Sequence, residues 1–255
     1  MITINGLQID DNVSFITEEV TYKSSPTRTI YSQDLSRRPG SKLTGVEWGA
    51  KEIEIKGRVF GTTVSGLIGN VDTLQQNAAV QSLALSIDQG RTYTATLESL
   101  DIPTQFYNQT MASFDAKFIA VDPFAYANQV VASGTVTSGT VTYNGSVTVS
   151  GNVWAGPLLT ITPAGANVGD SGIKSFMITH IPTGETITVS GMMSYNSGIV
   201  IDYQNFLVTN SGTLSDYTGI FSRWNPGNVN YTIAVTSGAK QKYLYKWAYS
   251  PRYYQ

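Results

Sequence analysis

Hydrophobic and polar residues alternate most regularly in residues 51–60. Apolar or small residues occupy every second position there, and charged residues occupy the positions between them. The first set is Ile53, Ile55, Gly57 and Val59, and the second is Glu52, Glu54, Lys56 and Arg58. A period of two with one apolar face is typical of a half-buried antiparallel strand. The pattern therefore predicts a strand over residues 51–60.

The next segment changes to a helical period. Its apolar residues recur three or four positions apart, which places them on one side of a helix. They are Val64, Leu67, Ile68, Val71, Leu74 and Ala78. Thr63 or Ser65 can cap the first turn, because a hydroxyl there accepts a backbone hydrogen bond. We predict one amphipathic helix over residues 65–81, and no other segment predicts a helix.

Further strands flank these two elements. Isoleucines and leucine alternate around Asn5-Gly6, a pair that favours a tight hairpin turn because both residues adopt positive φ. Asp88-Gln89-Gly90 predicts a second turn, which leads into a strand over 91–97. Residues 111–121 alternate again and stop before Pro123, which cannot donate to a sheet ladder. The first half of the chain is therefore expected to be β-rich with one helix.

The composition changes after Tyr126. Glycine, serine and threonine dominate, charges become rare, and short strands recur at intervals of roughly ten residues. These predicted strands cover 134–141, 146–149, 158–162, 175–181, 185–189, 198–202 and 230–235. Even spacing with turn signals and no helix is typical of an antiparallel β-sandwich. We expect a mainly β protein of two domains, 1–126 and 127–242.

The last segment, 243–255, is rich in aromatic residues and alternates well enough to form one more strand. Charge returns there with Lys246 and Arg252. The composition of this segment resembles that of the first domain, so we expect that it can return there.

Charge and cysteine content exclude several classes of protein. Only 13% of the residues are charged, against about 25% in ordinary soluble domains, and the net charge is −2. The chain therefore lacks a global basic surface for nucleic acid, and copies of it would repel one another little. Cysteine is absent, which excludes disulfides and thiol chemistry. We expect synthesis in the cytoplasm and no membrane helix, since no window approaches about 20 apolar residues.

Catalytic chemistry finds little support. The single histidine, His180, has no nucleophile elbow near it in the sequence, so we interpret it as structural. The pairs Glu18-Glu19 and Glu52/Glu54 could serve glycoside hydrolysis, but the second pair lies on a solvated strand face with Lys56. We predict no catalytic residues, no metal site and no cofactor.

Two sets of residues could bind a partner. Trp154 and Trp224 could stack on sugar rings, which makes a carbohydrate-binding sandwich the alternative function, although we favour a core role for both. Residues 32–45 are polar and basic and predict a loop or hairpin tip. Its Arg37, Arg38 and Lys42 could contact nucleic acid, but we interpret them as a solvated tip or a contact to another subunit.

The order of these elements resembles the distal tail proteins of siphophages. The matching segments are a strand ending in Asp-Pro-aromatic (118–126), a Gly-to-Pro stretch (151–157), a strand running into Asp (199–202), a Pro-Gly-Asn turn (226–228) and an aromatic closing strand (248–254). Each motif alone is weak, and the ordered set across the whole chain carries the resemblance.

This resemblance implies a structural virion protein at the phage tail tip. Its first domain would form the belt of a hexameric ring around a channel through which DNA passes. The ring would dock on the tail tube protein with one face and on the tail-tip hub or tail-associated lysin with the other. The second domain would be a galectin-like sandwich that serves as an interaction platform for host attachment. His180 is followed by Ile-Pro-Thr and not by the galectins' Asn-Pro-Arg, which argues against sugar binding.

Overall fold

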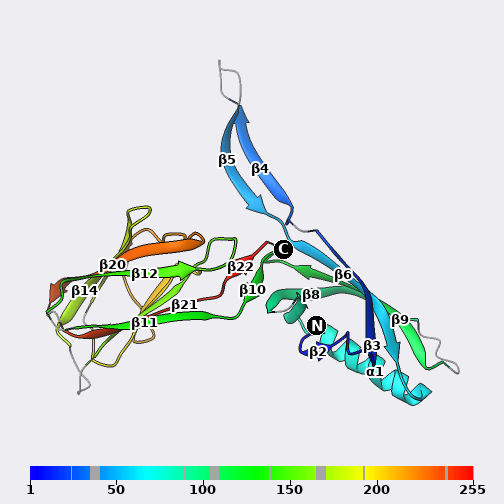
Figure 1. The fold of residues 1–255 in the computed structure, drawn as a ribbon. Coiled ribbons are helices and arrows are strands. Elements are labelled where there is room, and N and C mark those ends of the chain that lie inside the picture. The colour runs from blue at the N-terminus through cyan, green and yellow to red at the C-terminus, as the bar shows by residue number, and fades with distance from the viewer. Residues whose placement is uncertain are drawn as a thin grey trace. The chain divides into compact units, whose positions relative to one another are not determined.

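Strands make up most of the chain, as the alternating patterns predicted. The computed structural model describes residues 1–23, 25–34, 41–88, 90–103, 109–137, 139–164, 171–191, 193–238 and 241–254. Within these residues one α-helix accompanies 22 strands, so the expected mainly β class is confirmed. The chain divides into two compact units, Met1–Ala127 with Tyr253–Gln255, and Asn128–Arg252 (Figure 1).

Unit 1 is built on a nine-stranded sheet. Its main path runs β2-β1-β7-β8-β9-β6-β3, and β10 and β22 lie off this path. The strands are β1 (Thr3–Ile4), β2 (Leu7–Gln8), β3 (Phe15–Tyr22), β6 (Lys51–Phe60), β7 (Leu83–Asp88), β8 (Arg91–Asp101), β9 (Met111–Ala120), β10 (Ala125–Ala127) and β22 (Arg252–Tyr253). In β6 every second residue is buried, which confirms the predicted alternation.

Gly57 allows three of these strands to lie close together. It pairs with Thr17 of β3 and with Phe114 of β9. A Cβ added at Gly57 would lie 2.3 Å from the carbonyl oxygen of Ile16 and 2.8 Å from the Phe114 ring. No side chain fits there, so this position of the apolar face requires glycine.

The helix α1 (Val64–Ala78) lies in unit 1 and buries one stripe of side chains. Leu67, Val71, Leu74 and Ala78 are buried in the same core as Ile53 and Ile55 of β6. Thr63 is the N-cap, and its hydroxyl accepts a hydrogen bond from the Gly66 amide at 3.1 Å. The helix therefore begins one residue before the predicted start and ends three residues before the predicted end at 81.

Unit 2 is a sandwich of a six-stranded and a five-stranded sheet. Their orders are β11-β21-β13-β16-β17-β18 and β12-β20-β14-β15-β19. The strands are β11 (Val130–Val136), β12 (Thr142–Val149), β13 (Leu158–Pro163), β14 (Ile173–His180), β15 (Glu185–Ser190), β16 (Ile199–Asp202), β17 (Leu207–Asn210), β18 (Thr213–Leu214), β19 (Tyr217–Gly219), β20 (Gly227–Gly238) and β21 (Tyr243–Tyr249). All of their pairings are antiparallel.

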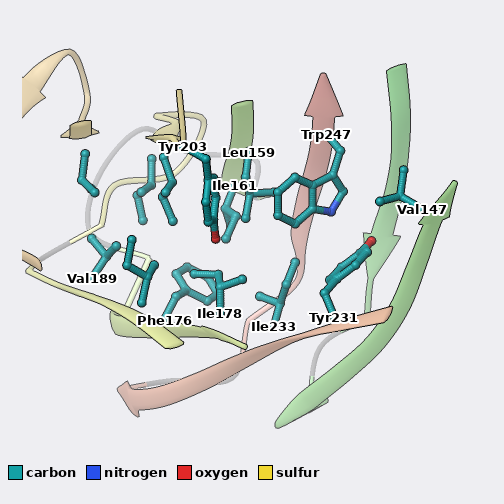
Figure 2. Close-up of a cluster of buried hydrophobic side chains, with 14 of the residues drawn as sticks. Val147, Leu159, Ile161, Phe176, Ile178, Val189, Tyr203, Tyr231, Ile233 and Trp247 are labelled. Carbon is teal, nitrogen blue, oxygen red and sulfur yellow. The ribbon is translucent and has the colours of Figure 1, made fainter. Parts of the chain in front are cut away.

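The core of unit 2 lies between the two sheets. Figure 2 shows Phe176, Ile178 and Ile233 of one sheet facing Leu159 and Ile161 of the other. The fully buried rings of Trp224 and Trp247 meet in this core with centroids 4.3 Å apart. Burial of this apolar surface holds the two sheets together.

Three elements differ from the expectations. Residues 32–34 and 41–45 of the segment expected as a loop or hairpin tip belong to two strands. These are β4 (Arg28–Asp34) and β5 (Ser41–Trp48), which form a separate two-stranded sheet. The short strands β17, β18 and β19 were not predicted, because two to four residues are too few to show a period. Strand β21 lies between β11 and β13 in unit 2, so within 243–255 only the residues from Tyr253 onward return to unit 1.

Candidate assembly surface

The most exposed element of unit 1 is the hairpin formed by β4 and β5. These strands pair from Arg28↔Trp48 to Asp34↔Ser41, with an irregularity in register after Tyr31. They belong to no larger sheet among the described residues, and they extend away from the nine-stranded sheet of their unit (Figure 1). A two-stranded hairpin without a covering layer is marginally stable in water.

The hairpin has one apolar and one polar face. Paired residues share a face and successive pairs alternate. On the apolar face Ile30, Val46 and Leu43 are 65%, 43% and 59% exposed. On the other face the Tyr31 hydroxyl donates a hydrogen bond to Glu47 Oε2 at 2.9 Å, which raises the pKa of Tyr31. Three large aliphatic side chains thus face solvent on one side of the element.

The root of the hairpin is held by the end of the chain. The Arg28 guanidinium lies 4.0 Å from the centroid of the Trp48 ring and 5.9 Å from that of Tyr254. Trp48, Tyr254 and Phe124 contact one another with centroids 5.1 to 5.8 Å apart. We call these four residues the root cluster. Ring and cation–π contacts of this kind each contribute about 0.5–1.5 kcal/mol.

Lys51 binds the same end of the chain from inside unit 1. Its side chain is only 2% exposed, and its ammonium donates to the Tyr93 hydroxyl at 2.8 Å and to the Tyr254 carbonyl at 3.1 Å. The rings of Tyr22 and Tyr93 lie 4.7 and 4.9 Å from Nζ. Burial lowers the pKa of Lys51 to about 8. The lysine lies in a cavity of 440 Å³ lined also by Lys23, Glu52, Glu98 and Lys117.

Sequence reasoning missed the root cluster and Lys51. One signal was present, because Lys51 is in phase with Ile53 and Ile55 on the buried face of β6. The contacts with Tyr254 join residues 130 to 226 positions apart and leave no local pattern. Of the residues expected to bind a partner, Lys42 is exposed on β5, and Arg37 and Arg38 lie outside the described residues.

His180 has no access to a substrate. It is 3% exposed, its Nδ1 lies 2.7 Å from the Thr183 hydroxyl, and its ring contacts that of Trp224 at 5.4 Å. Desolvation by burial lowers its pKa, opposed by the nearby Glu185. The neutral, enclosed imidazole is a packing element of the sandwich.

The carboxylates considered for hydrolysis lie in ion pairs or in solvent. Glu18 pairs with Arg58 at 2.7 Å, Glu54 pairs with Lys56 at 3.0 Å, and Glu52 is exposed. Within the described part of the chain, no group of three His, Asp or Glu side chains could hold a metal ion. In the same residues, no helix has the length and apolar character needed to cross a membrane.

The two tryptophans considered for sugar stacking have different surroundings. Trp224 is fully buried in the sandwich core, so it has no free face for a sugar ring. Trp154 is partly exposed, and the guanidinium groups of Arg223 and Arg252 lie 4.8 and 4.7 Å from its ring centroid. The enclosed ring of Trp224 argues against stacking on a sugar.

The architecture defines a class of protein, a β-rich unit with one helix and a long hairpin followed by a β-sandwich. Searches found no matching family model and no matching curated protein. Among solved structures, the chain is similar to the Dit (gp 19.1) protein of phage SPP1. The TM-score is 0.69 at 14% sequence identity, and the match covers 98% of each chain. The chain therefore has the distal tail protein fold.

Two structures of the phage P2 baseplate in its activated conformation, with Ca and with Sr, show a weaker likeness. Their TM-scores are 0.44 and 0.45 at 10% identity. They cover 91% and 94% of this chain, and 90% and 91% of their own. At this level they add nothing to the assignment of the fold.

Proposed function

We propose that this chain is a structural protein of a phage tail tip, and not an enzyme. Six copies form a ring that joins the tail tube to the baseplate or tail-tip hub. Unit 1 forms the belt of the ring, and unit 2 forms a galectin-like sandwich that serves as an interaction platform. The fold shared with a protein described as part of a hub adsorption apparatus supports this proposal.

The apolar face of the β4–β5 hairpin is the observation that carries the proposal of assembly. Ile30, Leu43 and Val46 are each more than 40% exposed on an element that has no covering layer of its own among the described residues. Exposed apolar patches of this kind mark interaction sites. In a ring, the neighbouring copy covers the apolar face of each hairpin. Closed symmetry gives every copy the same contact.

The root cluster supports the same role. A hairpin that bridges two copies must project from the nine-stranded sheet of its unit at a defined angle. Arg28 and Trp48 form the first cross-strand pair, and Tyr254 and Phe124 contact them from other parts of unit 1. These contacts therefore fix the hairpin at its base, while its apolar face remains available to a neighbouring copy.

The oligomeric state tests the proposal. We expect mass photometry of the purified chain to show species near six subunits, and electron microscopy to show rings. Leu43→Asp should shift the population to monomers, because a buried carboxylate is costly. Gln33→Asp, on the polar face of the same hairpin, is the matched control and should leave the rings intact. Monomers alone in the unmodified protein, at every concentration reached, would contradict the ring.

A further inference from the structure

The five-stranded sheet of unit 2 ends in a long strand whose free edge has no protection. Strand β12 has eight residues and, among the described residues, pairs only with β20 (Figure 1). A terminal strand offers backbone N–H and C=O groups to a further strand, and natural proteins usually protect such edges with charges, proline or a bulge. Residues 123–169 contain no Lys, Arg, Asp or Glu, β12 contains no proline, and its register with β20 is regular.

The terminal strand β3 of unit 1 shows the usual protection. It also has eight residues, but it carries Glu18 and Glu19, and its register shifts between Thr17 and Glu19. The other terminal strands of the sandwich are shorter than β12, because β11 has seven residues, β18 has two and β19 has three. In the described part of the sandwich, β12 is therefore the longest edge open to another strand.

Alternate residues of β12 direct their backbone groups away from β20. The Val235 amide donates to the Val141 carbonyl at 2.9 Å, so the odd-numbered residues bond to β20 and the even-numbered residues do not. Thr148 agrees with this alternation, because its carbonyl accepts a hydrogen bond from the Tyr249 hydroxyl at 2.6 Å. Three residues before Thr148 therefore point their N–H and C=O groups to the free edge. They are Thr142, Asn144 and Ser146.

The side chains of these three residues are exposed on the outer face of the sheet, whereas Val147 of the same strand points into the core (Figure 2). They are small, polar and uncharged. The neighbouring strand β20 carries no charged residue either. An identical surface would therefore meet this edge without electrostatic repulsion.

We propose that two copies of this chain pair through β12, edge to edge and antiparallel, around a two-fold axis at Asn144. In this register Asn144 lies opposite Asn144 of the second copy, and Thr142 lies opposite Ser146 of the second copy. The residues with free backbone groups then face one another, and each opposed pair forms two hydrogen bonds. The contact uses unit 2 and two-fold symmetry, so it is independent of the proposed ring.

The position of the axis follows from the strand itself. An axis at Gly145 would place Thr142 opposite Thr148, whose carbonyl the Tyr249 hydroxyl already binds. An axis at Tyr143 would place Ser146 opposite a residue before the start of β12. Only an axis at Asn144 pairs all three residues with free backbone groups among themselves.

A second copy fits this edge better than a charged partner does. A charged peptide or an anionic surface finds no complementary charge in residues 123–169. A second β12 supplies backbone donors and acceptors in the spacing and direction that the edge requires, and its hydroxyl and amide side chains can hydrogen-bond across the pair. Because both copies bring the same edge, the dimer saturates the contact.

Single cysteines test the pairing directly, because the chain has no cysteine of its own. Opposed residues of a hydrogen-bonded antiparallel pair have Cα atoms about 5.5 Å apart, which a disulfide can span. Under mild oxidation, Asn144→Cys should therefore form a disulfide-linked dimer on a denaturing gel. Asn230→Cys, on the same face of β20, is the matched control and should stay monomeric on that gel. Equal cross-linking of the two variants would overturn the proposal.

A mixing experiment tests the register. Thr142 and Ser146 lie opposite each other in the proposed dimer, and neither lies opposite its own copy. Thr142→Cys and Ser146→Cys should each cross-link little alone and should form a dimer when the two proteins are mixed. Cross-linking of each variant with itself, with no gain on mixing, would refute this register.

Charge variants test the same contact without a covalent bond. Leu43→Asp, which should prevent the ring, is the background, and sedimentation should show that it forms dimers at concentrations up to about 1 mM. In that background Asn144→Lys and Asn144→Glu each place two like charges directly opposite, so each should weaken the dimer about fivefold or more. An equimolar mixture of these two variants should restore the dimer, because opposite charges then face each other.

The outcomes separate this contact from the ring and from misfolding. Asn144 is exposed, so both charge variants should melt at the temperature of their parent. Asn144→Lys in the otherwise unmodified chain should leave the rings intact, so failure of the ring and failure of this contact are distinguishable. Monomers alone in Leu43→Asp at about 1 mM, or a mixture that associates no better than either charge variant, would refute the pairing.

Discussion

The two aromatic clusters of this protein use similar residues in opposite ways. The sandwich core encloses Trp224, Trp247 and Tyr231 almost completely, with centroids 4.3 to 5.9 Å apart. The root cluster has the same spacing, but Trp48 and Tyr254 remain partly exposed and a guanidinium covers one ring. The first arrangement stabilises a unit, and the second fixes the orientation of a projecting element.

This difference follows from where the contacts lie in the sequence. In the sandwich core Trp224 and Trp247 lie in one continuous region, Asn128–Arg252, that forms a unit by itself. In the root cluster, residues from β4 and β5 and Phe124, which lies between β9 and β10, meet Tyr254 near the end of the chain. Removal of the sandwich core should therefore unfold a unit, whereas removal of the root should release one hairpin.

The largest effect is expected in the sandwich core. Trp224→Ala removes a fully buried indole and leaves a cavity, which costs about 3–5 kcal/mol in the free energy of unfolding. Thermal unfolding followed by tryptophan fluorescence measures this loss. Trp154→Ala should cost less, because Trp154 is only partly buried. Equal stability of Trp224→Ala and the unmodified protein would contradict the buried position of this indole.

A smaller and local effect is expected at the root. A chain that ends at Tyr253 loses Tyr254, with two ring contacts and the carbonyl that Lys51 binds. These contacts together contribute about 2–3 kcal/mol. Amide hydrogen exchange should become faster in β4 and β5, while protection of β14 and β20 stays unchanged. Unchanged exchange in the hairpin would show that the end of the chain does not hold the root.

The pH dependence of the free energy of unfolding tests the role of the Lys51 ammonium. Burial lowers its pKa from 10.5 to about 8, so between these values the unfolded chain binds more protons than the folded one. The stability of unit 1 therefore rises with pH across this window. Relative to Lys51→Met, the free energy of unfolding should increase by about 2 kcal/mol from about pH 7.5 to about pH 9.5. Parallel pH profiles for the two proteins would contradict the low pKa.

The sequence predicted the elements in which a pattern of burial repeats along the chain, and it missed the elements that depend on distant contacts. The alternation in residues 51–60 and the helical period after Thr63 were sufficient for β6 and α1, because burial on one face repeats along each element. The hairpin was predicted only as a polar tip, since β4 and β5 carry exposed apolar residues that no part of their own unit buries. Strands β18 and β19 had no signal, because strands of two or three residues show no period.

The smallest expected effect concerns His180 in the sandwich core, and it appears in a different pH window from that of Lys51. Burial lowers the pKa of His180, so below the ordinary value of about 6.5 the unfolded chain takes up protons that the folded chain resists. The stability contributed by the neutral imidazole is therefore present above that pH and is lost as the pH falls through it. His180→Gln keeps a hydrogen-bonding group near Thr183 and removes the titration. Between about pH 7 and about pH 5, the unmodified protein should lose more stability than His180→Gln, whereas Lys51→Met should follow the unmodified protein. The acidic pH range then reports on the sandwich core, and the alkaline range reports on the root. If the difference in the free energy of unfolding between Lys51→Met and the unmodified protein changed in the acidic range, the two regions would not titrate separately.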